Sequence, residues 1–198
     1  MFSTFAVPST REVSLVAQWT GSELSNDTRG ITAPFYFSKM QKIKNPYEGL
    51  EEQGYFCFAC CPSNPYGLKM EFFEDGDDIV CFWEPRPEYQ SWINTLHGGI
   101  QATLLDEIGG WVVNRKLQKA GMTTSLAMKY RKPVPIGEGV VLELRAHIKE
   151  IKKSFAFIEA TLSHDGQVYS QCDMIYFCFS AEKSASDFGF YGCELEQE

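Results

Sequence analysis

A long apolar helix between two groups of strands is the feature that most constrains how this chain can fold. Residues 98–119 repeat apolar side chains every three or four positions, which is the spacing of one helix face. Because this face is so apolar, other elements must cover it along its length. The flanking segments have the pattern of strands, at 68–74 and 78–84 before the helix and at 122–135, 139–151, 154–164 and 167–180 after it. The sequence therefore predicts an α+β fold, with a curved antiparallel sheet of about six strands around one long central helix. Because the breaks between the later strands are short, we expect neighbouring strands to pair.

The length of 198 residues and the apolar content of 44% are typical of a single globular domain. We expect that domain at 50–180, after an N-terminal extension (1–49) that is either flexible or a mis-start before Met40, and before an acidic tail (181–198). The net charge of −8 argues against a nucleic-acid partner. The sequence contains no apolar run of membrane-spanning length and no secretory signal pattern. Seven cysteines, an odd number, are typical of reduced thiols, so we expect a cytoplasmic protein that does not enter a membrane.

The start of the predicted helix is the first candidate functional feature. His97 is followed by Gly98 and Gly99, and glycine lets a ligand approach the backbone closely. The N–H groups of the first helical turn have no acceptor within the helix, so they can bind an anion or stabilise a developing oxyanion. The alternative is a glycine-rich turn that binds nothing.

Asp106 is the second candidate, because it lies in the middle of an otherwise apolar helical segment. If its carboxylate is buried, desolvation should raise its pKa toward the range of a general base. The alternative is that Asp106 lies on an exposed face beside Glu107.

The two candidate features cannot act on one reacting group within a single chain. Asp106 follows Gly98 by eight residues, which is about 12 Å along a helix at 1.5 Å per residue. A base and an oxyanion hole must each lie about 3 Å from the reacting group. If both are functional, two antiparallel helices must be apposed, and the small side chains of Ala102, Gly109 and Gly110 would permit that approach. The spacing thus predicts, conditionally, a homodimer with two composite sites.

Four sequence blocks, in order over about 55–180, resemble the hotdog-fold acyl-CoA thioesterases of the phenylacetate-pathway (PaaI-like) branch. The blocks are CFACCPSNPYGL at 57–68, Tyr89-Gln90-Ser91, HGGIQATLLDE at 97–107, and the stretch from Thr123-Thr124-Ser125-Leu126 through Tyr130 to Gly137. The chain departs from the family pattern at Cys61 and at Ser91, where the family commonly has glycine.

The resemblance implies hydrolysis of acyl-CoA thioesters by a dimer or a dimer of dimers, with no cofactor beyond the CoA of the substrate. It implies that Asp106 is the general base or nucleophile, that the Gly98 N–H polarises the thioester carbonyl and that His97 shapes the turn. Thr123 would lie near the attacking water. The substrate-binding residues implied are Gln90, Ser91, Asn94, Gly99, Thr124, Arg131 and Lys132.

Cofactor phosphates need positive charge near the site. Basic clusters follow the helix (Arg115, Lys116, Lys119), flank a later turn (Lys149, Lys152, Lys153) and end a site strand (Lys129, Arg131, Lys132). We rank Arg131 and Lys132 first because they border the strand that carries Thr123. The acyl group is open, as is the choice between CoA and an acyl carrier protein as its carrier.

The Cys57-x-x-Cys60-Cys61 run is half of a zinc motif, but a structural zinc needs four ligands and no second pair follows. We therefore expect no metal. Two other functions stay open: a non-catalytic acyl-CoA or metabolite-binding hotdog protein, and a hotdog hydratase or dehydratase. A binding protein would gain nothing from Asp106, and a hydratase would need a histidine-based pair that this sequence does not show.

Overall fold

The structure is a computed structural model that describes residues 40–197, and these belong to one compact unit. The expectation about residues 1–39 lies outside the described residues. The central helix α2 (Gly98–Val112) begins at the predicted residue and continues as a π-helical turn, η3 (Val113–Leu117). It ends at Gln118, which adopts a left-handed conformation. Within the described residues, no helix is long and apolar enough to cross a membrane.

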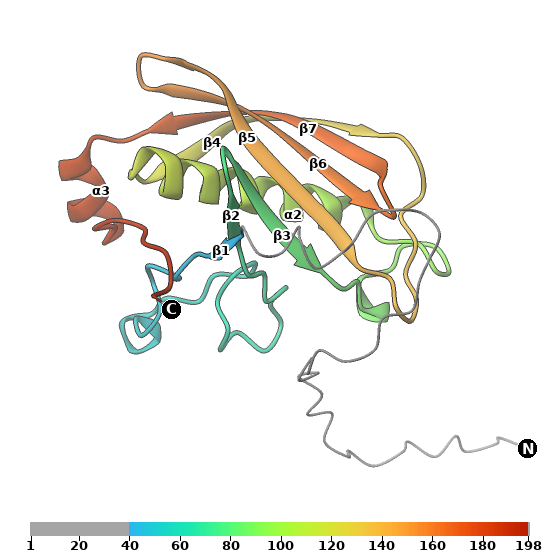
Figure 1. Cartoon of the computed structure of the whole chain (residues 1–198). Helices are drawn as coiled ribbons and strands as arrows, with labels where there is room; N and C mark the ends of the chain where they lie inside the picture. The colour runs from blue at the N-terminus through green and yellow to red at the C-terminus, as the bar shows by residue number, and fades with distance from the viewer. Residues whose placement is uncertain (1–39, 198) are drawn as a thin grey trace, which may run out of the picture. The chain divides into compact units, whose positions relative to one another are not determined.

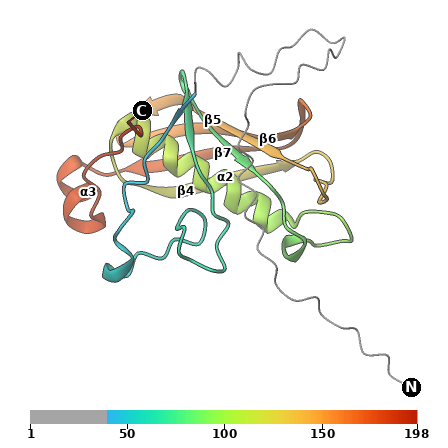
Figure 2. The same cartoon turned by 60° about the horizontal axis from the view of Figure 1, so that its bottom comes forward.

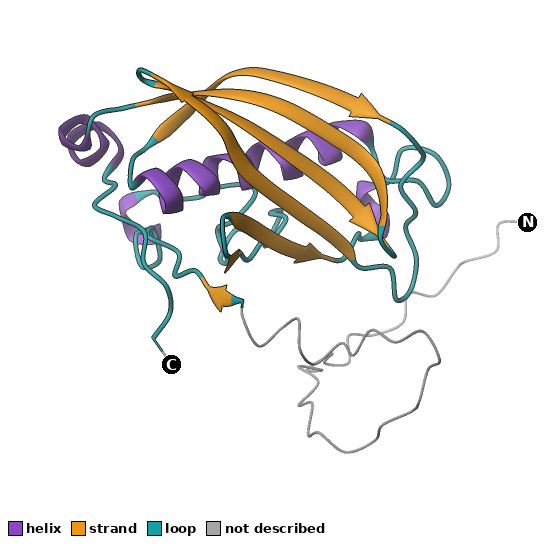
Figure 3. Ribbon diagram, turned by 45° about the horizontal axis from the view of Figure 1, so that its top comes forward, coloured by secondary structure: helices purple, strands orange, loops and turns teal. Residues whose placement is uncertain are grey.

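A seven-stranded antiparallel sheet curves over α2, as Figures 1 and 3 show. This confirms the predicted architecture. Across the sheet the order is β1-β2-β3-β5-β6-β7-β4. The strands are β1 (Gln41–Lys42), β2 (Phe73–Asp75), β3 (Asp78–Trp83), β4 (Gly121–Tyr130), β5 (Leu142–Lys152), β6 (Phe155–His164) and β7 (Gln167–Cys178). Two short 3-10 helices, η1 (Glu51–Gln53) and η2 (Pro87–Tyr89), lie in the loops.

One predicted strand pairing is wrong. β4 precedes β5 in the chain but pairs with β7, so it forms one edge of the sheet. The connection between them, 131–141, crosses to the other side of β7 and β6 instead of making a hairpin. The backbone groups along the outer edge of β4 therefore have no neighbouring strand within the described part of the chain.

The core lies between the sheet and α2, and it follows from the alternation of the strands. Over the first half of β5 and most of β6 and β7, every second residue faces the helix and is buried, whereas the residues between them are more exposed. On the other side of α2 runs the segment 43–72, which Figure 2 shows below the helix. Its side chains Leu68, Met70 and Phe72 are buried there, and the Phe72 ring stacks on Trp111 at 4.3 Å between centroids. These residues were predicted as a strand, but only the end of that segment is one.

The packed unit extends beyond residues 50 and 180. β1 pairs with β2, and Ile43 forms a bridge with Leu195. The segment expected to be an acidic tail contains the helix α3 (Ala181–Phe188) and the buried residues Phe190 and Cys193. Phe190 and Cys193 belong to the core cluster, and the side chain of Gln118, just after the helix, hydrogen-bonds to the backbone of Cys193.

Candidate functional site

The start of α2 is fixed by His97. This residue is the N-cap, and its Nδ1 accepts a hydrogen bond of 2.9 Å from the N–H of Gly99. Gly98 is the first helical residue, so its own N–H has no acceptor within the helix. The hydroxyl of Tyr130, at the end of β4, donates to the Gly98 carbonyl at 3.0 Å. The structure thus supplies the predicted helix start and places the end of β4 against it.

The Asp106 carboxylate is held by two hydroxyl groups. Thr123 Oγ1 donates to Asp106 Oδ1 at 2.7 Å, and Tyr176 OH donates to the same oxygen at 2.8 Å. Within residues 40–197, Asp106 Oδ2 has no hydrogen-bond partner. Asp106 is half-buried, so it is neither enclosed in the core nor on a fully exposed face. The arrangement leaves one carboxylate oxygen oriented and available.

Tyr176 was not singled out from the sequence. It lies on the inward row of β7 with Cys172, Met174 and Cys178, and such a row indicates core packing. Only the 2% exposure of a side chain that carries a hydroxyl distinguishes it, because a buried hydroxyl needs a partner. Burial and the neighbouring Asp106 charge raise the pKa of Tyr176 far above its usual range, so it remains a donor.

A cavity of about 220 Å³ opens at Asp106. Elements far apart in the sequence form its wall: α2, the start of β4, β7 and the end of α3. The lining includes Asp106, Glu107, Gly110, Thr123, Tyr176 and Phe188. The site therefore combines a held carboxylate with space for a small group.

The remaining predicted binding residues are divided between two places. Gln90, Ser91 and Asn94 are exposed in the loop before His97, where the backbone of Gln90 bridges to Leu96 and Ser91 N–H donates to the Thr95 carbonyl at 2.9 Å. Gly99 is exposed in the first turn of α2, so all four lie at the Gly98 end of the helix.

Thr124 is placed differently from Thr123. The register of β4 shifts between Thr123 and Ser125, and the Thr124 hydroxyl donates to the Ile175 carbonyl at 2.9 Å. Its hydroxyl is therefore used within the sheet, whereas that of Thr123 is used on Asp106.

The basic clusters differ in whether their side chains already form ion pairs. Arg115 and Lys116 both pair with Glu74, at 2.7 and 3.1 Å. Lys129 and Lys149 both pair with Asp173. Arg131 and Lys132 are exposed and form no ion pair within residues 40–197, although Arg131 donates to the Gln171 side chain. They directly follow Tyr130, whose hydroxyl contacts Gly98.

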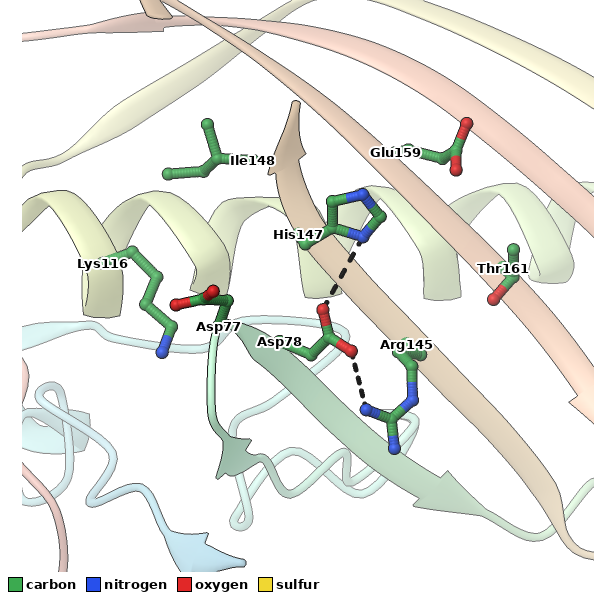
Figure 4. A pocket seen from close by; sticks show the side chains of 8 residues that line it. All are labelled: Asp77, Asp78, Lys116, Arg145, His147, Ile148, Glu159 and Thr161. Carbon is green, nitrogen blue, oxygen red and sulfur yellow. Dashed lines mark hydrogen bonds and ion pairs between the residues drawn. The ribbon is translucent and has the colours of Figure 1, made fainter. Parts of the chain in front are cut away.

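A larger cavity, of about 700 Å³, lies away from Asp106 on the outer side of the sheet (Figure 4). Its charged side chains neutralise one another: Asp78 accepts from Arg145 at 2.7 Å and lies 3.7 Å from His147. It contains no orientated carboxylate beside a helix start, so we assign the functional site to Asp106.

A second group of titratable side chains lies one residue from Asp106. The thiols of Cys57 and Cys60 and the carboxylate of Glu107 converge, with their nearest ligand atoms all within 4.8 Å of one another. A hydrogen bond from the Cys60 thiol outweighs burial and lowers the pKa of Cys57 to about 5. Burial and the neighbouring Cys57 charge raise the pKa of Glu107 to about 7. Of the residues described, these are the ones that could hold a metal ion.

Comparison with known proteins covers the segment that carries this site. The model of the thioesterase superfamily matches residues 93–171, which include both His97 and Asp106. The chain is 30% identical over 87 residues to acyl-coenzyme A thioesterase 13 of Homo sapiens, covering 43% of this chain and 61% of that protein. It is 26% identical over 122 residues to acyl-coenzyme A thioesterase THEM4 of Bos taurus, covering 61% of this chain and 50% of that protein.

A crystal structure of a thioesterase superfamily protein has the same fold, with a TM-score of 0.56 at 24% identity over 61% of this chain and 62% of the other. Of the two curated relatives named above, the chain spans only about half to three fifths of their length. With its curved sheet around α2 the chain has the hotdog fold, and its central segment is similar to the thioesterase superfamily.

Proposed function

We propose that this protein hydrolyses acyl-CoA thioesters to the free acid and CoA. Two relatives are named acyl-coenzyme A thioesterases, and the thioesterase superfamily model matches the segment 93–171, which carries Gly98 and Asp106. The observation that carries the proposal is the Asp106 carboxylate, which is held at Oδ1 by Thr123 and Tyr176 while Oδ2 has no hydrogen-bond partner among residues 40–197. A protein that only bound acyl-CoA would have no use for an oriented carboxylate beside a thioester.

Asp106 acts in one of two ways. As a general base it takes a proton from a water molecule, which attacks the thioester carbonyl; as a nucleophile it attacks the carbonyl itself and the resulting anhydride is then hydrolysed. In both cases the carbonyl oxygen gains negative charge, the carbon–sulfur bond breaks and CoA leaves as its thiolate, which then takes up a proton. The free N–H of Gly98 stabilises that oxygen, and His97 holds the turn that presents it.

The donor and the base come from two copies of the chain. Within one copy Gly98 and Asp106 are separated by about 12 Å of helix. β4 runs past both, with Thr123 beside Asp106 and Tyr130 beside Gly98. If two β4 edges pair antiparallel about a twofold axis midway between these residues, each Asp106 approaches the helix start of the other copy. The open edge of β4 supports this arrangement.

Arg131 and Lys132 bind the phosphates of the CoA moiety. They are exposed and are not used in ion pairs among the described residues, and they follow the strand end that contacts Gly98. A planar guanidinium and an ammonium are the side chains that recognise phosphate best. We therefore favour CoA as the carrier, as in the PaaI-like branch. The alternative is an acyl carrier protein, whose phosphate group and acidic surface would contact the same two residues.

Substitution of Asp106 tests the proposal. Asp106→Asn keeps the size of the side chain but removes its basicity, so we expect kcat for acyl-CoA hydrolysis to fall at least about 100-fold. A panel of aryl, short-chain and medium-chain acyl-CoAs would be followed by the absorbance of the thioester bond, because the seven cysteines of the chain would react with thiol reagents.

Asp77→Asn is the matched control, since it removes an exposed carboxylate at the outer cavity and should leave kcat unchanged. Unchanged turnover in Asp106→Asn would refute the assigned role. A wild-type chain that binds acyl-CoA without hydrolysing any of the panel would instead favour the non-catalytic function.

A further inference from the structure

Three ligand atoms converge on the side of α2 that faces away from the sheet. The segment 55–61 crosses α2 there and brings Cys57 and Cys60 to Glu107. Cys57 Sγ lies 3.8 and 3.9 Å from the two oxygens of Glu107, and the nearest ligand atoms of all three residues are within 4.8 Å of one another. A tetrahedral zinc ion, with bonds of about 2.3 Å to sulfur and 2.1 Å to oxygen, separates its ligands by about 3.6–3.8 Å. The distances between Cys57 and Glu107 therefore already match an edge of such a site, and the distances to Cys60 exceed one by at most about 1 Å.

Neighbouring groups orient each of the three ligands. The Cys60 N–H donates to Cys57 Sγ at 3.4 Å, and the Tyr55 hydroxyl lies 3.0 Å from Cys60 Sγ. The indole N–H of Trp111 donates to Glu107 Oε1 at 3.0 Å. Hydrogen bonds of this kind fix the direction of metal ligands and stabilise thiolates.

The charge of the cluster is not balanced by side chains. Cys60 is buried, and Cys57 and Glu107 are half-buried. Within residues 40–197, no lysine, arginine or histidine forms an ion pair with Glu107, whereas the partly buried Glu74 pairs with both Arg115 and Lys116. Negative groups held together in this way are costly unless they are protonated or bind a cation. A cysteine pair that served only as a dithiol would not explain why a carboxylate is directed at both thiols.

We propose that Cys57, Cys60 and Glu107 bind one Zn²⁺ ion, with a water molecule in the fourth position. Two thiolates and a carboxylate in a tetrahedral arrangement are a ligand set that selects zinc over magnesium or calcium. The ion joins the segment 55–61 to the helix that carries Asp106, one residue away, and so stabilises the wall of the site. Cysteine and histidine spacing alone does not reveal such a site, because Glu107 lies 50 residues from Cys57.

Metal content of the purified full-length chain tests this proposal. After loading with Zn²⁺ and dialysis against a weak chelator, we expect about one zinc per chain by elemental analysis. Cys57→Ser, Cys60→Ser and Glu107→Gln should each reduce the content at least about fivefold. Cys61→Ser is the matched control: its thiol is adjacent in sequence but contacts Ser63 instead of the cluster, so the zinc content should stay near one.

Replacement of zinc by Co²⁺ provides a second readout that does not depend on activity. The wild-type chain should show the visible and near-ultraviolet bands of tetrahedral cobalt bound to thiolate, and Glu107→Gln, which retains the side-chain volume, should alter them while the circular dichroism stays unchanged. Wild-type chain with much less than one zinc after loading would overturn the proposal. So would a Cys61→Ser content as low as that of Cys57→Ser.

Discussion

Thr123 and Tyr176 decide which oxygen of Asp106 is free, because both donate to Oδ1. Thr123→Val keeps the shape of the side chain but removes one donor, so the carboxylate can rotate out of its productive orientation. We expect kcat to fall about tenfold, which corresponds to about 1.4 kcal/mol, with little change in KM. Thr123→Ser retains the hydroxyl and should recover most of the rate. Equal losses in both variants would show that Thr123 contributes packing and not a hydrogen bond.

The same residues show how far the sequence alone could define the site. Asp106 is detectable as a carboxylate in an apolar helix, and Thr123 through the family resemblance. Tyr176 and Glu107 are not detectable in this way. Tyr176 alternates with outward residues and resembles a core residue, whereas Glu107 resembles an exposed neighbour of Asp106. Their roles depend on partners 70 and 50 residues away, and no local pattern records such contacts.

At the scale of elements, the two adjacent glycines of α2 have different functions. Gly109 and Gly110 are both predicted from the sequence to lie on a face that approaches a second helix. Gly109 instead faces the sheet: a Cβ there would lie 2.9 Å from Met174 Cε and 3.0 Å from Tyr176 Cε2. At Gly110 the nearest atom would be 3.9 Å away. Gly109 therefore sets the distance between helix and sheet, and with it the contact between Tyr176 and Asp106.

This difference predicts opposite effects of the same substitution. Gly110→Ala should stabilise the fold by up to about 1 kcal/mol, because alanine favours the helix and has room. Gly109→Ala gains the same propensity but forces Met174 and Tyr176 aside, so we expect a net loss of about 1–2 kcal/mol. Urea unfolding of the two variants measures both free energies, and equal values would contradict the assignment.

Element periodicity was sufficient for α2 and for the later strands, because each has one buried and one exposed face. It was insufficient for β1 and α3, which are short and only weakly apolar, and for the pairing of β4. A strand pattern gives the two faces of a strand but not its neighbour, and a connection such as 131–141 is long enough to reach either edge.

At the scale of the whole molecule, the open edge of β4 is the surface on which a second copy of the chain could pair. A ten-residue edge strand with unpaired backbone groups is prone to pair with another chain. Ala127 lies near the middle of β4, is exposed, and faces the outer side of the sheet, so a larger side chain fits there in a single copy. In the twofold pair proposed above, the two Ala127 residues lie close to the axis.

Ala127→Glu should therefore weaken dimer formation without unfolding the chain. Two carboxylates near the axis repel each other, and we expect the dimer dissociation constant to rise at least about tenfold. Because each site needs Gly98 of one copy and Asp106 of the other, kcat/KM should fall in parallel with the dimer fraction measured by light scattering. Thr161→Glu adds the same charge on β6, which at that residue is paired with both β5 and β7 beside the outer cavity, and should change neither quantity. If Ala127→Glu becomes monomeric and keeps full activity, the carbonyl must be polarised from within one chain, and the helix start of the second copy has no part in the reaction.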